Sequence, residues 1–302
     1  MLYKLSAVKF NTLFYSMVSL CLLSLCVAKV THARSLDDIN ESKYIVIAVY
    51  DNYLPFSARV EGAPTGIDVD IATHIAKTMN VDLRLKWMTA DESTEDDLRN
   101  NLWKGHFLDK TKADLMLRVP YDKDYTLKRD DVGLLVHEQV HMFAPYHTET
   151  WKIVFDQSRL ADVPTMALFQ YHPIGVEIDS IPQFYLMSAF RGSMAKNTRQ
   201  FDTLALAVKG MQATKVDAVM GLRSQITAFH HTLDPNQYQL ANNSFPLLGK
   251  QKWDIGMAVQ TDYRALGYEV GDIVGAMVKD GTLAKIFAAH HAEYEVPAYY
   301  TE

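Results

Sequence analysis

Three consecutive segments decide the fold: YIVIAVY (44–50), IDVDIATHIAKTM (67–79) and VDLRLKW (81–87). The first is rich in β-branched residues and ends at Asp51, as a strand before a turn does. The second has apolar residues at helical spacing, whereas the third alternates like a strand. This order of strand, helix and strand predicts an α/β fold with parallel strands, whose ligands bind beyond the carboxyl ends of the strands.

The same pattern continues outward from these segments. A further strand is predicted over 113–119, so the loops 51–57 and 118–124 both follow strand ends. The pattern starts again in the second half, with a strand expected over 163–169 and another that ends at Gly221. A chain of 302 residues, 48% hydrophobic and 22% charged, fits one large domain or two smaller ones.

The first 33 residues have the composition of an export signal. Lys4 and Lys9 precede an apolar run over 10–28, and Thr31-His32-Ala33 offers small residues where a signal peptidase reads. We expect a signal peptide over 1–33, cleaved after Ala33, and a periplasmic location. The alternative is a retained membrane anchor, although the run is short for a bilayer span.

Cleavage would change both the charge and the redox chemistry of the chain. The whole chain has a net charge of −6, and the segment removed holds three lysines and no acidic residue, which leaves about −9. Such a protein is poorly suited to bind nucleic acid or an anionic membrane. Cys21 and Cys26 are both in this segment, so the mature chain could form neither a disulfide nor a thiolate metal site.

The sequence contains no familiar catalytic motif. It has neither a G-x-S-x-G elbow, nor an H-E-x-x-H helix, nor a phosphate-binding P-loop. The histidines are poorly spaced for a metal, since His137 and His141 on a predicted strand would stand about 13 Å apart. We therefore expect no catalysis, no metal and no cofactor.

Several stretches resemble the two-lobed periplasmic solute-binding proteins, family 3, which serve amino-acid ABC transporters. They are IVIAVYDNYLPFS (45–57), GIDVDIATHIAKTMNVDLRLKW (66–87), KVDAVMGLRSQITAF (215–229), DIGMAV (254–259) and MVKDGTLAKIFAAH (277–290). The resemblance implies the type 2 periplasmic binding protein fold. In that α/β fold two mixed sheets flanked by helices are joined by a two-strand hinge, and any ligand lies in the cleft between the lobes.

The chain of that family crosses between its lobes twice. The resemblance implies a lobe I of residues 34–138 plus 252–302 and a lobe II of residues 139–251, with hinge segments near 137–143 and 247–253. Bending at the hinge would close the lobes around the cleft. We expect a monomer.

A narrower resemblance is to the MxaJ and XoxJ type of protein that accompanies quinoprotein methanol dehydrogenases. It rests on the loop Asp51–Ser57, the helix end Arg99–Leu102, and Asp114–Pro120 followed by Tyr121-Asp122; Arg118 stands where this type usually has glycine. The resemblance implies a non-catalytic accessory that contacts the quinoprotein dehydrogenase or its cytochrome. The alternative is the substrate-binding component of an ABC transporter, which contacts a permease and a small solute.

The charged anchors of amino-acid binders in this family are missing. Those proteins carry Thr-x-x-Arg after the third strand for the ligand carboxylate and an aspartate after the lobe II strand for its ammonium group. Here the loop reads RVPYDKDYT (118–126), and Leu222 takes the aspartate position. Losing two charged partners costs several kcal/mol of binding, so we expect a solute that is not a standard α-amino acid.

The candidate cleft residues come from both predicted lobes. They are Tyr50, Asp51, Asn52, Tyr53, Phe56, Arg118, Pro120 and Tyr121 in lobe I, and Gln170, Tyr171, His172, Gly221 and Arg223 in lobe II. The aromatic residues suit a flat or apolar ligand, or they belong to the core. Arg118 contacts a ligand or partner, or it pairs with Asp122 or Asp124. Residues 170–175 should start a helix whose free N–H groups favour an anion, and Arg223 faces the cleft or solvent.

Overall fold

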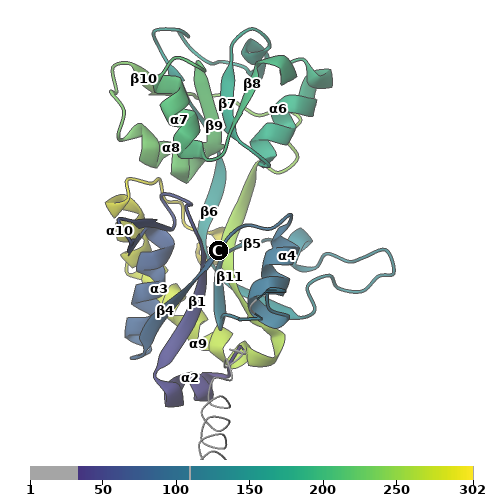
Figure 1. The fold of residues 1–302 in the computed structure, drawn as a ribbon, viewed down its shortest axis with the longest axis vertical. Coiled ribbons are helices and arrows are strands. Elements are labelled where there is room, and N and C mark those ends of the chain that lie inside the picture. The colour runs from purple at the N-terminus through teal and green to yellow at the C-terminus, as the bar shows by residue number, and fades with distance from the viewer. Residues whose placement is uncertain (1–32, 109, 302) are drawn as a thin grey trace, which may run out of the picture.

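The computed structural model describes residues 33–301 except residue 109, so all but the last residue of the predicted signal peptide lies outside the described residues. The described chain forms two lobes, stacked along the long axis of the molecule (Figure 1). Two long strands, β6 (Val140–Asp156) and β11 (Lys252–Gln260), run through the waist between them. None of the helices in the described part of the chain combines the length and the hydropathy that a transmembrane span requires.

Lobe I is built on the three segments that decide the fold. They form β1 (Tyr44–Tyr50), α3 (Ile67–Thr78) and β4 (Asp82–Met88), and β1 pairs in parallel with β4 and with β5 (Leu115–Tyr121). The apolar face of α3 is fully buried, and each such side chain contributes roughly 1.5 to 3 kcal/mol. The other elements of lobe I are α2 (Leu36–Ser42), β2 (Ala58–Val60), β3 (Ala63–Thr65), α4 (Thr94–Leu98), the π-helix Arg99–Trp103, α5 (Lys123–Thr126), the 3₁₀ turns Thr261–Tyr263 and Ala298–Tyr300, α9 (Arg264–Lys279) and α10 (Thr282–Ala289).

Lobe II repeats this plan with shorter strands. Its parallel strands are β7 (Ile174–Glu177), β8 (Thr198–Phe201) and β9 (Ala218–Leu222). Helices flank this sheet, as Figure 1 shows. They are α6 (Ile181–Gly192), α7 (Leu204–Gln212) and α8 (Arg223–His230), and the lobe also contains the 3₁₀ helices Met166–Gln170 and Ala195–Asn197 and the short strand β10 (Tyr238–Leu240).

The two predicted mixed sheets meet in β6. The strand order β4-β1-β5-β11-β6-β9-β7-β8 is continuous, with β10 paired to β6 beside this path. Residues 140–150 of β6 pair with β11, whereas residues 151–155 pair with β9. Because 140–150 bond to a strand of lobe I, we place the first crossing between the lobes near Thr150 rather than at 139. The second crossing stays at Lys252, where β11 begins.

The strand predicted over 163–169 is wrong. Pro164 has no N–H to give to a ladder, and Thr165 caps a 3₁₀ helix by accepting the Ala167 N–H at 3.4 Å. The strand of this region is β7 instead, which begins at Ile174. Gln170, Tyr171 and His172, which we expected to follow a strand end, therefore precede a strand instead.

Candidate functional site

A pocket lies between the lobes, beyond the carboxyl ends of β1, β7, β8 and β9, where open α/β sheets bind their ligands. Its volume accessible to the centre of a water molecule is about 20 Å³, which is room for one or two waters. A larger solute therefore enters this pocket only if the lobes open. Its wall consists of Asn52, Tyr53 and Leu54 from lobe I and Glu177, Thr203, Leu204, Ala205, Gln225 and Phe229 from lobe II.

The lobe I part of the wall is a tight loop after β1. Tyr53 donates its N–H to the Ser57 carbonyl at 2.8 Å, and the Ser57 hydroxyl donates to the Tyr50 carbonyl at 2.6 Å. Asn52 has a left-handed backbone with φ of 53°, which asparagine tolerates better than most residues. The Tyr53 ring centroid lies 5.8 Å from that of Tyr50 and 5.1 Å from that of Phe56. The loop thus holds the Tyr53 ring in a fixed position.

The lobe II part of the wall contains one carboxylate and one direct link to lobe I. Gln225 donates its side-chain amide N–H to the Leu54 carbonyl at 3.0 Å across the pocket. Glu177, at the end of β7, accepts the N–H of Leu204, the first residue of α7. Burial raises the pKa of Glu177 to about 7, and the Leu204 N–H opposes this rise only in part.

Two of the predicted cleft residues, Tyr50 and Asp51, make contacts outside the pocket. Tyr50 donates its hydroxyl to Asp97 at 2.7 Å, inside lobe I, and Asp51 pairs with Arg59. Neither Tyr50 nor Asp51 is in the wall of the pocket. Of the predicted residues, Asn52 and Tyr53 are the ones that the structure brings into it.

Arg118 is buried in lobe I. Its guanidinium carbon lies 3.4 Å from the centroid of the Phe56 ring and 5.7 Å from that of Tyr53. Its Nη1 lies 3.8 Å from Oδ1 of Asp68, and the predicted pairing with Asp122 or Asp124 is wrong. The buried guanidinium meets a carboxylate from α3, whereas Asp122 pairs with Lys250 at 2.7 Å.

The charge of Arg118 is compensated inside the protein. Burial raises the pKa of Asp68 to about 6, while the Arg118 charge and a hydrogen bond from the Tyr146 hydroxyl at 3.1 Å oppose the rise. Asp68 Oδ2 and Arg118 Nη1 are both buried without a hydrogen-bond partner. Because a carboxylate and the Phe56 ring already face the guanidinium, Arg118 does not present a free cation to a ligand carboxylate.

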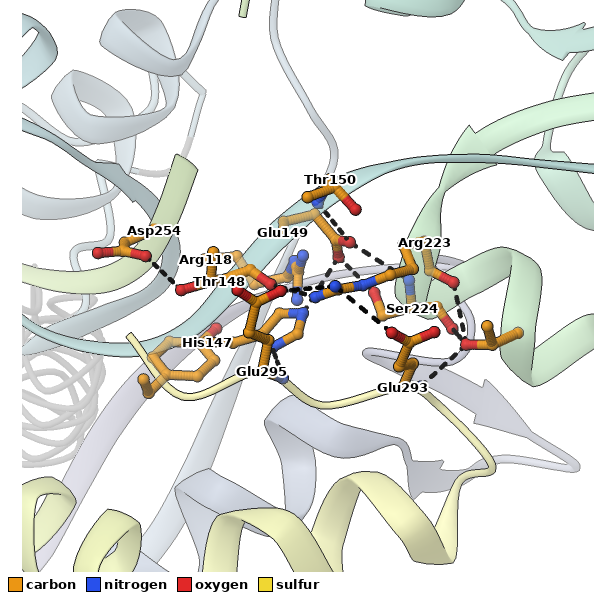
Figure 2. Close-up of polar contacts among 12 residues, drawn as sticks. Arg118, His147, Thr148, Glu149, Thr150, Arg223, Ser224, Asp254, Glu293 and Glu295 are labelled. Atoms are coloured by element: carbon orange, nitrogen blue, oxygen red, sulfur yellow. Dashed lines mark hydrogen bonds and ion pairs between the residues drawn. The ribbon is translucent and has the colours of Figure 1, made fainter. Parts of the chain in front are cut away.

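A polar network ties the lobes together where β6 crosses between them (Figure 2). Glu149 is fully buried and accepts the backbone N–H and the hydroxyl of Ser224, at the start of α8. It also lies 3.4 Å from Nε2 of His147. Burial would raise the pKa of Glu149, but His147, Ser224 and the Arg118 charge outweigh it and hold the pKa below its usual value.

Arg223 belongs to the same network and faces neither the cleft nor open solvent. It donates to the Thr148 carbonyl at 2.7 Å and pairs with Glu295 at 2.6 Å and with Glu293 at 3.4 Å. Figure 2 shows its side chain directed toward the segment that carries these two glutamates. The buried hydrogen bond to Thr148 contributes about 1.5 to 3 kcal/mol, and the ion pairs with the partly exposed glutamates add about 0 to 1 kcal/mol each, so Arg223 fixes α8 against β6 and the carboxyl-terminal segment.

A second cavity lies on the hinge and is larger, with about 510 Å³ by the same measure. Of the predicted residues it contains Tyr121, whereas Pro120 is in β5 opposite Ile255. All of its wall comes from lobe I and the hinge strands, so closing the lobes would not enclose a ligand there. The wall consists of Tyr121, Asp122, Lys123, Thr148, Lys252, Trp253, Asp254, Glu295, Val296, Ala298 and Thr301.

Most of the residues predicted in lobe II are misplaced. Gln170, Tyr171 and His172 precede β7 and so lie at the amino end of the lobe II strands, away from the pocket. His172 pairs there with Asp217 at 2.9 Å, and the expected anion site at a helix start is absent from this segment because β7 follows it. Gly221 is buried in β9, where an added Cβ would lie 2.6 Å from the Leu204 side chain.

Glu177 was not among the predicted residues, because the predicted strand ended at 169, eight residues before the end of β7. Its signal in the sequence is short: the apolar run IGV, then Glu177, then the helix cap Ser180. Among the described residues, no group of three or more His, Cys, Asp and Glu side chains could hold a metal ion.

The chain matches one family model, that of bacterial extracellular solute-binding proteins, family 3, over residues 45–103. This match covers the segment from β1 to the π-helix of lobe I. A search of curated proteins found no match.

Solved structures are similar over almost their whole length. An amino acid ABC transporter substrate-binding protein from Streptococcus pneumoniae, bound to L-arginine, is 19% identical, with a TM-score of 0.61 over 85% of this chain and 98% of that one. An ancestral cationic amino acid solute-binding protein is 18% identical, with a TM-score of 0.65 over 85% of this chain and 99% of that one. A solute receptor for L-cysteine of Neisseria gonorrhoeae is also 18% identical, with a TM-score of 0.59 over 85% of this chain and 93% of that one. These similarities confirm the predicted fold: the chain has the two-lobed α/β fold of periplasmic binding proteins.

Proposed function

We propose that this protein is an exported solute-binding protein and the substrate-binding component of an ABC transporter. The match to the family 3 model supports this role, and so do the similar structures, two of which are named as amino acid ABC transporter substrate-binding proteins. Its expected partners are a permease and a small solute. The predicted export, monomeric state and lack of catalysis belong to this proposal.

The observation that carries the proposal is that both lobes supply the wall of one pocket. Lobe I contributes the loop 52–54, and lobe II contributes Glu177, the last residue of β7, and residues that follow β8 and β9. A solute would enter with the lobes apart and be enclosed as they close, when Gln225 reaches the Leu54 carbonyl. The cavity of about 20 Å³ is then the remnant of the cleft in the closed protein.

The charges in the cleft argue against a standard α-amino acid. No lysine or arginine is in the wall of the pocket, and Arg118 is compensated by Asp68 and Phe56. Leu222 offers no charge where an ammonium group would need one. A zwitterion would therefore leave its carboxylate unpaired in a partly dry site, which costs binding free energy.

A thermal-shift screen of small solutes tests the proposal, with Tyr53→Ala as the site variant and Tyr171→Ala as its control. Tyr171 is highly exposed and lies outside the pocket wall. A solute at about 100 times its Kd should raise the Tm of the wild type by roughly 5 °C or more. The affinity should fall at least tenfold in Tyr53→Ala and stay unchanged in Tyr171→Ala. Equal binding by both variants would contradict the proposed site.

The role of accessory to a quinoprotein dehydrogenase is the second candidate. It rests on the residues shared with the MxaJ and XoxJ type, and the comparisons contain no link to such an enzyme. Co-purification with a quinoprotein dehydrogenase or its cytochrome, and no solute in the screen, would favour it.

One ancestral neighbour is described as a precursor of cyclohexadienyl dehydratase, so a dehydratase assay is the check on the non-catalytic role.

A further inference from the structure

Glu177 is the one charged side chain in the wall of the interlobe pocket. It forms no ion pair with any other described residue, and its carboxylate accepts a single backbone N–H, that of Leu204. Other buried carboxylates of the described chain have either a cation beside them, as Asp114 has Arg34, or several hydrogen bonds, as Asp97 has from the Tyr50 hydroxyl and the Asp91 N–H. Glu177 has neither a cation nor a second hydrogen bond among the described residues.

Leaving a carboxylate partly buried without a cation is costly. The pKa of Glu177 rises to about 7 because burial outweighs the single N–H. A cation that entered the pocket would remove this cost, since it would replace the lost water with a charge-assisted hydrogen bond.

The rest of the wall suits an ammonium group. Tyr53 and Phe229 line the same space, and aromatic rings attract cations electrostatically. Asn52 is in the same wall, and its side chain has an amide oxygen that can serve as a neutral acceptor. Room for one or two waters matches the size of an ammonium head group, and the wall offers no cation to a ligand carboxylate.

The charged groups behind the wall do not cancel this preference. Arg118 lies 5.7 Å from the Tyr53 ring, but Asp68 pairs with it and Glu149 adds a second negative charge to its surroundings. Burial raises the pKa of Tyr53, so its hydroxyl stays neutral at physiological pH. The helices α7 and α8 bring no titratable side chain into the wall.

We propose that Glu177 forms the cation subsite of the cleft and that the solute is a small amine, bound through its ammonium group to Glu177 beside Tyr53 and Phe229. The inference rests on the proposed solute-binding function and adds the chemical class of the solute. It also predicts that the other end of the solute carries no charge.

The test compares three probes of similar size on the full mature chain at pH 8: n-propylammonium, n-propanol and propionate. Calorimetry and thermal shift should show n-propylammonium binding at least tenfold more tightly than n-propanol, and no binding of propionate. In Glu177→Gln the affinity for n-propylammonium should fall at least tenfold. Glu269→Gln, at an exposed position of α9, is the matched control and should leave it unchanged.

The pH dependence gives a second readout. The carboxylate must be ionised to pair with the amine, and it becomes protonated as the pH falls through a pKa of about 7. The affinity of the wild type for n-propylammonium should therefore fall about tenfold from pH 8 to pH 6, and that of Glu177→Gln should not change.

The outcomes separate this inference from the proposed function. Unchanged n-propylammonium affinity in Glu177→Gln, or tighter binding of n-propanol or propionate, would overturn the cation subsite and leave solute binding intact. If none of the three probes and no solute of the wider screen binds, the solute-binding function fails and the inference fails with it.

Discussion

The hinge network and the interlobe pocket both join lobe I to lobe II, but they treat buried charge differently. In the hinge network Glu149 meets Ser224 and His147, and Arg223 meets Glu295. In the pocket, Glu177 meets one backbone N–H. The paired contacts of this network hold the lobes together whether or not a solute is present, although Nε2 of His147 and Nε of Arg223 have no hydrogen-bond partner there. An unsatisfied carboxylate instead makes the closed protein more stable when a cation is bound, because only then is its charge paired.

The largest effect is expected from Glu149→Ala, which removes the buried carboxylate of the hinge network. The change leaves the Ser224 hydroxyl and N–H without their acceptor in a fully buried site, and it removes the carboxylate that lies 3.4 Å from Nε2 of His147. We expect a loss of roughly 3 to 5 kcal/mol in the free energy of unfolding, measured by denaturant titration. Glu269→Ala, an exposed control, should change it by less than about 0.5 kcal/mol, and similar losses in both variants would show that the network does not stabilise the protein.

A smaller effect is expected from Arg118→Met, which removes the internal cation of lobe I. Asp68 then stays buried with the Tyr146 hydroxyl but without its cation, and we expect a loss of roughly 2 to 3 kcal/mol at pH 8. The pKa of Asp68 is already raised to about 6 and would rise further without Arg118. The loss should therefore shrink toward pH 5, where the folded protein can keep Asp68 protonated.

The double variant Arg118→Met with Asp68→Asn controls this prediction. It removes both charges, so it should recover most of the lost stability and show no such dependence on pH. If it is as unstable as Arg118→Met alone, the cost comes from lost packing on Phe56 rather than from the unpaired carboxylate.

The smallest effect, and one of opposite sign, is expected from Glu177→Gln without solute. The folded pKa of Glu177 is raised to about 7 from an ordinary value of about 4.3, so the ionised group destabilises the fold above pH 4 and does so fully above pH 7. After allowance for its partial exposure, Glu177→Gln should gain roughly 1 to 2 kcal/mol at pH 8 and nothing near pH 4. Denaturation at pH 8, 6 and 4 measures this, and a loss of stability at pH 8 would mean that Glu177 already has a partner.

The sequence predicted the parts of the fold that depend on local patterns. β1, α3 and β4 follow directly from alternation and helical spacing, and the loop with Asn52 and Tyr53 follows from the end of β1. β7 was missed because it is four residues long and follows a proline, so its pattern is too short to stand out from its surroundings.

Contacts between distant segments could not be predicted. For Arg118 we expected either contact with a ligand or partner or an ion pair with an aspartate four or six residues away, but its carboxylate comes from position 68 on another element. The hinge network joins Glu149 to Ser224, 75 residues apart, through the packing of α8 on β6. Spacing along the chain contains no information about such pairs, because the approach of two elements depends on every contact between them.

The position of the carboxyl terminus has a practical consequence. The last described residues lie at the waist of the molecule, whereas α2 lies at the far pole of lobe I (Figure 1). Thr148 donates its N–H to the Glu295 carbonyl, and Thr301 lines the cavity on the hinge. A fluorophore attached behind this tail would sit close to the axis of any lobe movement and report on the angle between the lobes. An affinity tag at the same end risks restraining that movement, so immobilisation is better made through the far pole of lobe I.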